Sequence, residues 1–532
     1  MKKIINLLLI GAVAVGVSSC KKYLDINTNT NNATTATPAL VLPQAIVGTA
    51  SITQSLNSAY YFPGGFAANI YGVGGYGSGV TYAYTAGSFV TGFSSSYDNA
   101  TDYQYVIDNT AATPGLAYST AIARIMKAYV FAKVVDQYND VPYSEALKGN
   151  SVLAPKYDKA EDIYKDLVAQ LTASINAITT AQAGTTANKV LASADPLFKG
   201  DMNLWKKFAN TLKLRLLIKM AGVTALQSYT TTEFAALNTT VGFLTTDALV
   251  NPGYVKAINS QGISQQNPNY GSLAFGTDNA RSQGQAIPTR WIFSFYNGTK
   301  LSDPGRGGVI FRGFPSTAVN QLGEENTVSS QVPPAGSTSW FTGVDANTPG
   351  LGVAKGPSQG QSLMLASESY FLQAEAYVRG YLTGDAKTAF NAGITASFNY
   401  LYQNQSNVVD ASKNVNADVT TYLTTNNTSR LANFDLATNN EQKIEAIITQ
   451  KYIAMNMIHC DEAFNEFKRT TYPTIVNGSQ DPLLTFASKQ SVSTRPDKLI
   501  GRVLYPQSEY NLNPTNVPSV TLFGSRIFWD LN

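Results

Sequence analysis

The sequence has little of what catalytic and metal sites are usually built from. It contains one histidine, His459, and two cysteines, Cys20 and Cys460, among 532 residues. A histidine-based metal site needs more than one such ligand, and a Cys-x-x-Cys site needs two closely spaced cysteines. His459 and Cys460 are neighbours, and neighbours on a helix do not face each other as a base and a nucleophile must. We therefore expect both to be buried structural residues, and we expect no metal, no cofactor and no enzymatic activity.

Charged side chains are also scarce. Asp, Glu, Lys and Arg make up 14% of the chain, against roughly 25% in an average globular protein. The formal net charge is +3, and four of the lysines stand at positions 2, 3, 21 and 22. No stripe of basic residues is visible, which argues against a nucleic acid partner. Asn, Thr, Ser, Gln and Tyr supply the polarity instead, and such a surface suits neutral, hydroxyl-rich ligands.

The common catalytic motifs are absent as well. No G-x-S-x-G, P-loop or dinucleotide-binding pattern stands in a strand-turn-helix setting, and Gly72-Val73-Gly74-Gly75 lies in a loop-like stretch. Glu368 and Glu375 are seven residues apart, which puts them about 10 Å apart on one helical face. We expect them to pair with Arg or Lys of neighbouring helices. A surface hydrolase remains an alternative, because a glycosidase needs only two carboxyl groups.

The N-terminus reads as a targeting segment. Residues 1–3 are positively charged, residues 4–17 are apolar, and Val17-Ser18-Ser19-Cys20 resembles the lipobox of bacterial lipoproteins. The apolar run is about 14 residues, short of the roughly 20 that cross a membrane, and no later stretch comes close. We predict a signal peptide over 1–19, a lipid-bearing Cys20 and a tether over 20–45. An ordinary signal peptide with a chance cysteine is the alternative.

Apolar residues recur at helical spacing over six stretches. These are 117–138, 158–178, 202–222, 363–381, 384–402 and 440–458. Asp158, with Glu161 three residues later, is typical of a capping box. Residues 60–105 and 223–360 are instead rich in Gly, Pro, Asn, Ser and Tyr, and we expect them to be loops. We predict a single, mostly α domain over 46–532, with a loop-rich region at about 223–360.

Several stretches, in order along the chain, carry a family resemblance. They are Tyr23-Leu24-Asp25-Ile26-Asn27, Asp136 to Ala146 (DQYNDVPYSEA), Gly200 to Arg215 (GDMNLWKKFANTLKLR), Glu368 to Ala376 (ESYFLQAEA), Gln450 to Ala454 (QKYIA), Arg469 to Pro473 (RTTYP), Arg502 to Pro506 (RVLYP) and Phe528-Trp529-Asp530. Together they resemble the SusD/RagB-type nutrient-binding lipoproteins of Bacteroidetes. Asn139 stands where the family has Gly, and Lys468 replaces the first Arg of the pair that precedes Thr.

The resemblance implies both an architecture and a role. The expected fold is mostly α, with tetratricopeptide-like helical pairs as a scaffold and a loop-rich region for the ligand. The expected partner is a SusC-like TonB-dependent outer-membrane transporter, to which the lipid-anchored protein delivers oligosaccharides from the exterior face of the outer membrane. Two alternatives stay open: a peptide ligand, or a gating subunit with little ligand binding of its own.

Aromatic and polar residues in the two loop-rich stretches are the candidates for ligand contacts. Aromatic rings cover the apolar faces of sugars, while amide and charged groups meet the hydroxyls. The candidates are Tyr82, Tyr84, Tyr97 and Asn99 in the first stretch, and Tyr270, Arg281, Trp291, Trp340 and Phe341 in the second. For each residue the competing interpretation is that it packs in the core or against the transporter.

Overall fold

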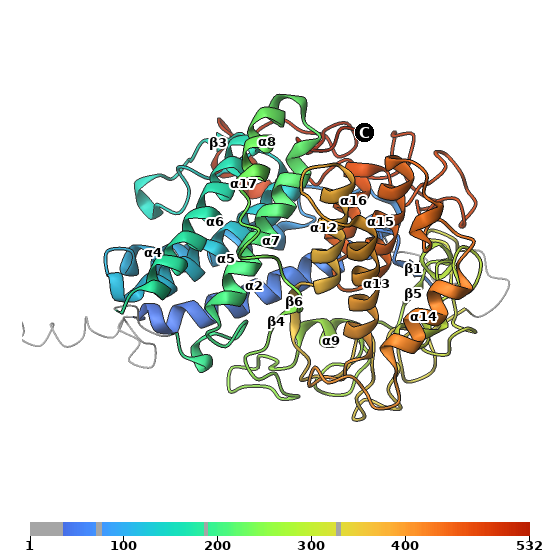
Figure 1. The fold of residues 1–532 in the computed structure, drawn as a ribbon. Coiled ribbons are helices and arrows are strands. Elements are labelled where there is room, and N and C mark those ends of the chain that lie inside the picture. The colour runs from blue at the N-terminus through green and yellow to red at the C-terminus, as the bar shows by residue number, and fades with distance from the viewer. Residues whose placement is uncertain (1–35, 71–76, 186–189, 326–330) are drawn as a thin grey trace, which may run out of the picture.

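The computed structural model describes residues 36–70, 77–185, 190–325 and 331–532. The prediction of a mostly helical fold is confirmed. Figure 1 shows two groups of helices, one blue to green and one orange to red, which meet where α7 lies beside α12. Buried side chains from both groups form one continuous core. The predicted signal peptide and Cys20 lie outside the described residues.

The first group of helices comes from the N-terminal half. It consists of α2 (Pro38–Ala59), α4 (Val90–Thr110), α5 (Ala117–Tyr138), α6 (Ala160–Ala183), α7 (Met202–Ala221) and α8 (Gln227–Ala235). Consecutive members from α4 to α8 pack against each other. The second group consists of α12 (Ala366–Val378), α13 (Ala386–Tyr402), α14 (Val415–Thr425), α15 (Asn440–Ala454) and α16 (Cys460–Thr470), followed by the isolated α17 (Gln507–Leu512). This is the tetratricopeptide-like pairing that the resemblance implied.

Helix α5 is central because almost all of its surface is covered. A helix with apolar residues all round must be buried, and α5 packs against α2, α4, α6 and α7. It ends at Asn139, whose φ of 60° lies in the left-handed region that Gly, Asn and Asp adopt most readily. The Asn139 side-chain oxygen also accepts the Phe528 N–H at 2.7 Å. Asn139 therefore adopts a backbone conformation that favours glycine, and its side chain adds a tie to the C-terminal segment.

Helix α2 was not expected from the sequence. It starts at Pro38, within the stretch predicted to be a tether, and buries Leu42 and Ala45, so the folded body begins earlier than residue 46. By length and composition α2 is apolar enough to cross a membrane, but half of its most apolar window is buried inside the protein. It packs against α4, α5 and α16. Inside the described residues, α2 therefore acts as a core helix.

Two further expectations were wrong in detail. The whole of 90–105, the second part of a stretch expected to be a loop, belongs to α4. The predicted capping box is absent, because α6 starts at Ala160 and its N–H donates to Asp140 at 3.0 Å. Asp158 instead accepts the N–H of Ser144 at 2.7 Å, on the preceding turn. The competing hydrogen bonds come from a segment that is distant in sequence, so local spacing does not reveal them.

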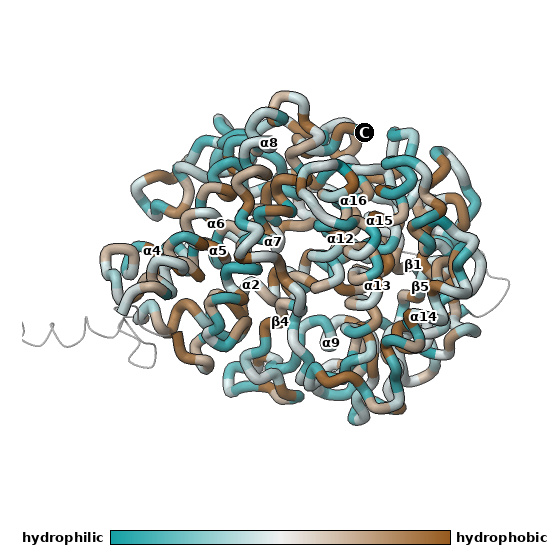
Figure 2. Tube along the Cα trace, in the orientation of Figure 1, coloured by the Kyte–Doolittle hydropathy of each residue, from teal (hydrophilic) through white to brown (hydrophobic). Residues whose placement is uncertain are grey.

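The loop-rich region carries short elements. Between α8 and α12 lie β4 (Ala248–Val250), α9 (Pro268–Leu273), β5 (Ala286–Pro288), α10 (Arg290–Phe293), α11 (Pro304–Ile310) and β6 (Gln361–Met364). The strands pair two by two, all antiparallel: β1 (Ala67–Asn69) with β5, β2 (Val141–Pro142) with β3 (Tyr157–Asp158), and β4 with β6. Figure 2 shows hydrophobic and hydrophilic residues alternating along the loops near α9 and α14. Apolar side chains of this region, among them Leu273, Phe275 and Tyr422, are buried.

The signature residues form buried ion pairs, as predicted. Arg215 of α7 binds Glu368 of α12, with its guanidinium 2.6 Å from the carboxylate. Arg469 of α16 binds Glu375 of α12 at 2.7 Å, and Arg379 on the same helix reaches that carboxylate as well. Burial alone would raise the pKa of Glu375, but the two arginines bring it down to about 2. These carboxylates connect helices and are not free for acid–base chemistry.

Candidate ligand-binding cavity

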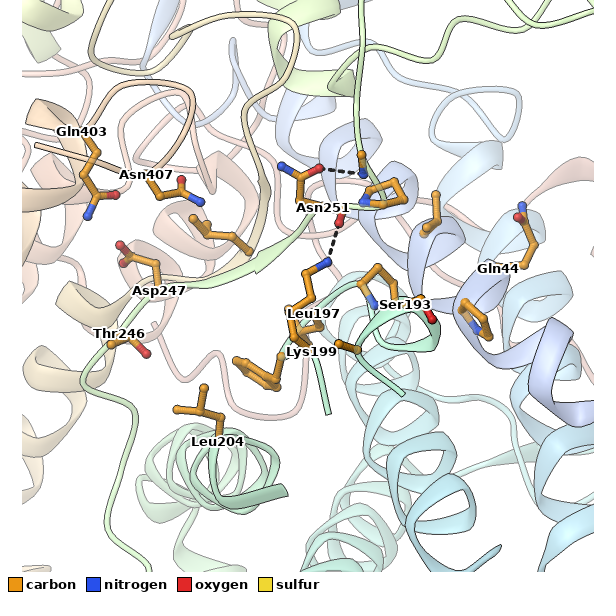
Figure 3. A pocket seen from close by; sticks show the side chains of 18 of the residues that line it. Gln44, Ser193, Leu197, Lys199, Leu204, Thr246, Asp247, Asn251, Gln403 and Asn407 are labelled. Atoms are coloured by element: carbon orange, nitrogen blue, oxygen red, sulfur yellow. Dashed lines mark hydrogen bonds between the residues drawn. The ribbon is translucent and has the colours of Figure 1, made fainter. Parts of the chain in front are cut away.

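A cavity of about 970 Å³ opens on the surface where four distant parts of the chain meet (Figure 3). Its walls are the start of α2, the loop before α7, the strand β4 with the residues on either side of it, and the turn after α13. The residues that line it are Leu40, Pro43, Gln44, Val47, Ala192, Ser193, Pro196, Leu197, Phe198, Lys199, Leu204, Thr246, Asp247, Leu249, Asn251, Pro252, Gly253, Gln403 and Asn407. The volume lies at the upper end of the 300–1,000 Å³ usual for small-molecule sites.

Asp195 fixes the wall in front of α7. Its carboxylate accepts the backbone N–H groups of Leu197 and Phe198, both at 3.0 Å. It also accepts the indole N–H of Trp205 at 2.8 Å. Asp195 is fully buried, and a buried carboxylate is stable only when such donors surround it. Trp205, one of the signature residues, therefore supports the cavity wall through Asp195 but does not itself line the cavity.

Asn251 fixes the adjoining wall, and its backbone N–H donates to the Pro196 carbonyl at 2.8 Å. Its side-chain oxygen accepts the N–H of Gly253 at 2.9 Å, and its amide donates to the carbonyl of Ser358 at 3.0 Å. The Lys199 amine donates to the Asn251 carbonyl at 2.8 Å, a bond drawn in Figure 3. Both walls are thus preorganised, and the only lysine of the cavity already has a partner.

The chemistry of the lining suits an uncharged, hydroxyl-rich ligand. Leucine and proline side chains give apolar contact, while Gln44, Ser193, Thr246, Gln403 and Asn407 add amides and hydroxyls. Figure 3 draws Gln403, Asn407 and Asp247 on the same side of the cavity. Asp247 is the one carboxylate of the lining. Amides and hydroxyls both donate and accept hydrogen bonds, as sugar hydroxyls require.

Five of the aromatic residues predicted to contact a ligand are buried. Tyr82, Tyr270, Trp291, Trp340 and Phe341 are each at most 1% exposed. Phe341 packs edge-on against Tyr270, with ring centres 5.9 Å apart, and the Lys300 amine covers the Trp291 ring at 3.2 Å from its centre. In this structure none of the five offers a free ring face, because the loops fold around them as around a second core. Their prediction as ligand platforms is corrected to core packing.

Two other candidates serve the packing of α4. The Tyr97 hydroxyl donates to the Pro142 carbonyl at 2.6 Å. The Asn99 amide donates to the Ala45 carbonyl of α2 at 2.8 Å, and its oxygen accepts the Thr49 hydroxyl at 2.7 Å. Asn99 is 5% exposed. Both residues hold α4 in place, and neither lines the cavity.

Tyr84 and Arg281 are two further candidates that solvent can reach. Tyr84 is half-buried and packs edge-on against Phe89 at 4.9 Å between ring centres. Arg281 is exposed. Neither lines the cavity of Figure 3, so the structure does not bring the predicted candidates together into one site. A ligand contact at Tyr84 or Arg281 stays a prediction.

Sequence reasoning missed the residues that line the cavity. The one available signal was Asp195-Pro196-Leu197-Phe198, which stands just ahead of the signature stretch that begins at Gly200. Nothing in the sequence marks Asp247 or Gln403, because each belongs to a short segment without periodicity.

His459 and Cys460 are buried as predicted, at 1% and 0% exposed. Burial lowers the pKa of His459, and its ring nitrogen lies 2.9 Å from the Ser362 hydroxyl. Burial raises the pKa of the Cys460 thiol, so the nucleophilic thiolate form is disfavoured. Within the described ranges no group of three or more His, Cys, Asp or Glu residues is placed to hold a metal ion.

The fold places the chain among the proteins built on a tetratricopeptide-like helical scaffold. More particularly, the chain belongs to the SusD-like family, whose model is described as "starch-binding associating with outer membrane" and matches residues 30–495. The expected SusD/RagB-type assignment is thereby confirmed. No curated protein sequence matches the chain.

Solved structures show the same fold. A SusD homologue from Bacteroides fragilis is 22% identical, with a TM-score of 0.67 over 93% of this chain and 99% of that one. A SusD/RagB family protein from Bacteroides thetaiotaomicron is 17% identical, with a TM-score of 0.68 over 93% and 99% of the two chains. A chitin-binding SusD homologue from Flavobacterium johnsoniae is 20% identical, with a TM-score of 0.67 over 92% and 99%.

Proposed function

We propose that this protein captures oligosaccharides at the outer surface of the outer membrane and delivers them to a SusC-like TonB-dependent transporter. The observation that carries the proposal is the open cavity, whose lining of amides, hydroxyls and aliphatic side chains matches a neutral glycan. The family description names starch, and a relative of similar fold is named as chitin-binding. A lipid on Cys20 would hold the protein at the membrane.

Binding without catalysis fits the side chains of this site. The lining includes a single carboxylate, Asp247, whereas hydrolysis of a glycosidic bond uses two carboxyl groups that face each other across the bond. Affinity would come from hydrogen bonds and apolar contact in a site whose two walls are already fixed. A preformed site loses little conformational entropy on binding.

The test is calorimetric titration of the purified chain with neutral oligosaccharides, acidic oligosaccharides and short peptides, followed by chromatography of each mixture. Saturable binding of a neutral oligosaccharide without new products is the expected result. Gln403→Ala should weaken it about two- to tenfold, the usual effect of one neutral hydrogen bond. Gln227→Ala, at an exposed position outside the cavity, is the matched control and should change nothing.

Other outcomes would replace the proposal. If the folded protein binds nothing, the gating-subunit interpretation takes over, with the ligand site completed by the transporter. If only peptides bind, the cargo class is wrong. If shorter oligosaccharides accumulate, the protein is a hydrolase.

A further inference from the structure

A second cavity, of about 660 Å³, adjoins the first. It lies over α12, α13 and α14, where Tyr370, Asn399 and Asn416 contribute to its lining. Three residues line both cavities: Thr246, Asp247 and Gln403. The two hollows therefore meet at one place, and the side chains of that junction reach a ligand in either.

Asp247 lies at this junction, and one of its two carboxylate oxygens already accepts a hydrogen bond. Its Oδ1 accepts the N–H of Ala366, the first residue of α12, at 2.8 Å. Its Oδ2 has no hydrogen-bond partner within the described residues, and no lysine or arginine of that part of the chain lies within 4.0 Å. The side chain is half-buried, so its charge is only partly solvated.

No charged or titratable group around Asp247 pairs with its Oδ2 within the described residues. Lys355 lies behind it, 1% exposed, with its amine donating to the Tyr400 carbonyl at 2.6 Å and lying 3.9 Å from the centre of the Tyr400 ring. Tyr370 flanks Asp247 in the second cavity, and Lys199 in the first is bound to Asn251. None of these groups donates a hydrogen bond to the free oxygen.

Gln403 adds a second acceptor without a donor. Its Oε1 is buried and has no hydrogen-bond partner within the described residues. A buried acceptor left unpaired costs about 1–3 kcal/mol, so a rotation of the Gln403 amide that brings this oxygen to a donor on a ligand is favourable. The junction thus offers one charged oxygen without a donor, beside an amide whose own oxygen is buried and unpaired.

We propose that the two cavities form one groove for an extended glycan and that Asp247 and Gln403 select, at its centre, a sugar unit with a free amino group. An ammonium group supplies both the donors and the positive charge that the junction lacks, and charge-assisted bonds are about twice as strong as neutral ones. A carboxylate or sulfate at the same place would meet Asp247 with like charge. The inference rests on the proposed glycan-binding function and names the sugar class.

The pH dependence follows from the same groups. Burial raises the pKa of Asp247 to about 6, while the Ala366 N–H and the Lys355 charge act in the opposite direction. Burial lowers the pKa of Lys355 to about 7. As the pH rises through about 6, Asp247 gains its negative charge, so the groove should bind a ligand that still carries its ammonium group more tightly above this pH than below it.

The experiment compares three probes of equal length on the full chain in detergent: an oligomer of glucosamine, an oligomer of N-acetylglucosamine and an oligosaccharide containing glucuronate. The wild type should prefer the glucosamine oligomer about tenfold or more, as one charge-assisted hydrogen bond allows. Asp247→Asn keeps an acceptor for the Ala366 N–H and should abolish that preference. Asp278→Asn removes the same charge from an exposed loop and should leave the preference intact.

Each other result has a defined meaning. Equal affinity for the three probes, or an unchanged preference in Asp247→Asn with an unchanged melting curve, overturns this inference and leaves glycan capture standing. Tighter binding of the glucuronate-containing oligosaccharide than of the glucosamine oligomer overturns the sugar class. Absence of binding to every probe overturns both this inference and the proposed function.

Discussion

The Lys219 amine lies 2.7 Å from a carboxylate oxygen of Glu462, and neither side chain is more than 1% exposed. The same amine donates to Asp136 at 2.7 Å. Burial by itself would lower the pKa of Lys219, but Asp136 and Glu462 hold it above its ordinary value. Three helices, α5, α7 and α16, are joined at this point of the core.

Removing one partner of this cluster should lower the free energy of unfolding. Glu462→Gln removes one of the two carboxylates that balance the buried charge of Lys219. Breaking a buried ion pair lowers the free energy of unfolding by about 3–5 kcal/mol. The measurement is the free energy of unfolding in urea. The control is Lys387→Met, which breaks the exposed pair with Asp435 and should cost at most about 1 kcal/mol. Equal losses in both variants would show that the buried cluster does not hold the helices together.

The crossing of α12 and α13 predicts a steric effect. A Cβ atom added to Gly393 would stand 2.6 Å from the ring of Phe371, so Gly393→Ala should force the helices apart and destabilise the fold by about 1–3 kcal/mol. Gly308 on α11 has open space around it. Gly308→Ala should be neutral or should stabilise by up to about 1 kcal/mol. Thermal unfolding of both variants checks this, and a stable Gly393→Ala variant would refute the tight crossing.

Acid should weaken the protein through Glu375. Its pKa in the folded state is about 2, below the ordinary value of roughly 4.3 expected in the unfolded chain. A depressed carboxyl pKa stabilises the fold above the unfolded value, and this stabilisation is lost as the pH falls from about 4 towards 2. Glu375→Gln should therefore differ from the wild type by about 3 kcal/mol at pH 7, and by much less near pH 2.5. A pH-independent difference in urea unfolding would contradict the assignment.

Trp340 offers a test of its corrected role. The side chain is fully buried, so Trp340→Ala should lower the free energy of unfolding by about 3–5 kcal/mol, as large-to-small changes in a core do. Tyr84→Ala, at a half-buried position, should cost less. Urea unfolding gives both values. If Trp340→Ala unfolds like the wild type but loses ligand affinity, the original platform prediction was right.

Much of the scaffold could be predicted from the sequence. Helices α5, α7, α12, α13 and α15 follow from apolar residues at steps of three and four, because a helix is a local structure whose buried face repeats with its turn. The ion pairing of Glu368 and Glu375 was predictable in kind, since carboxylates on a buried face need cationic partners. The identity of those partners, Arg215 and Arg469, was not, since it depends on which helices become neighbours.

The candidate site, unlike the scaffold, could not be predicted from the sequence. The sequence by itself determined six of the long helices (α5, α6, α7, α12, α13 and α15), the signature residues that pack between them and the near absence of catalytic side chains such as histidine. Only the tertiary structure decided that Trp340 and Trp291 are enclosed, and that Gln44, Asp247 and Gln403 share a cavity. The physical reason is that exposure and convergence depend on contacts between distant segments, whereas residue type and periodicity record only what each segment does locally.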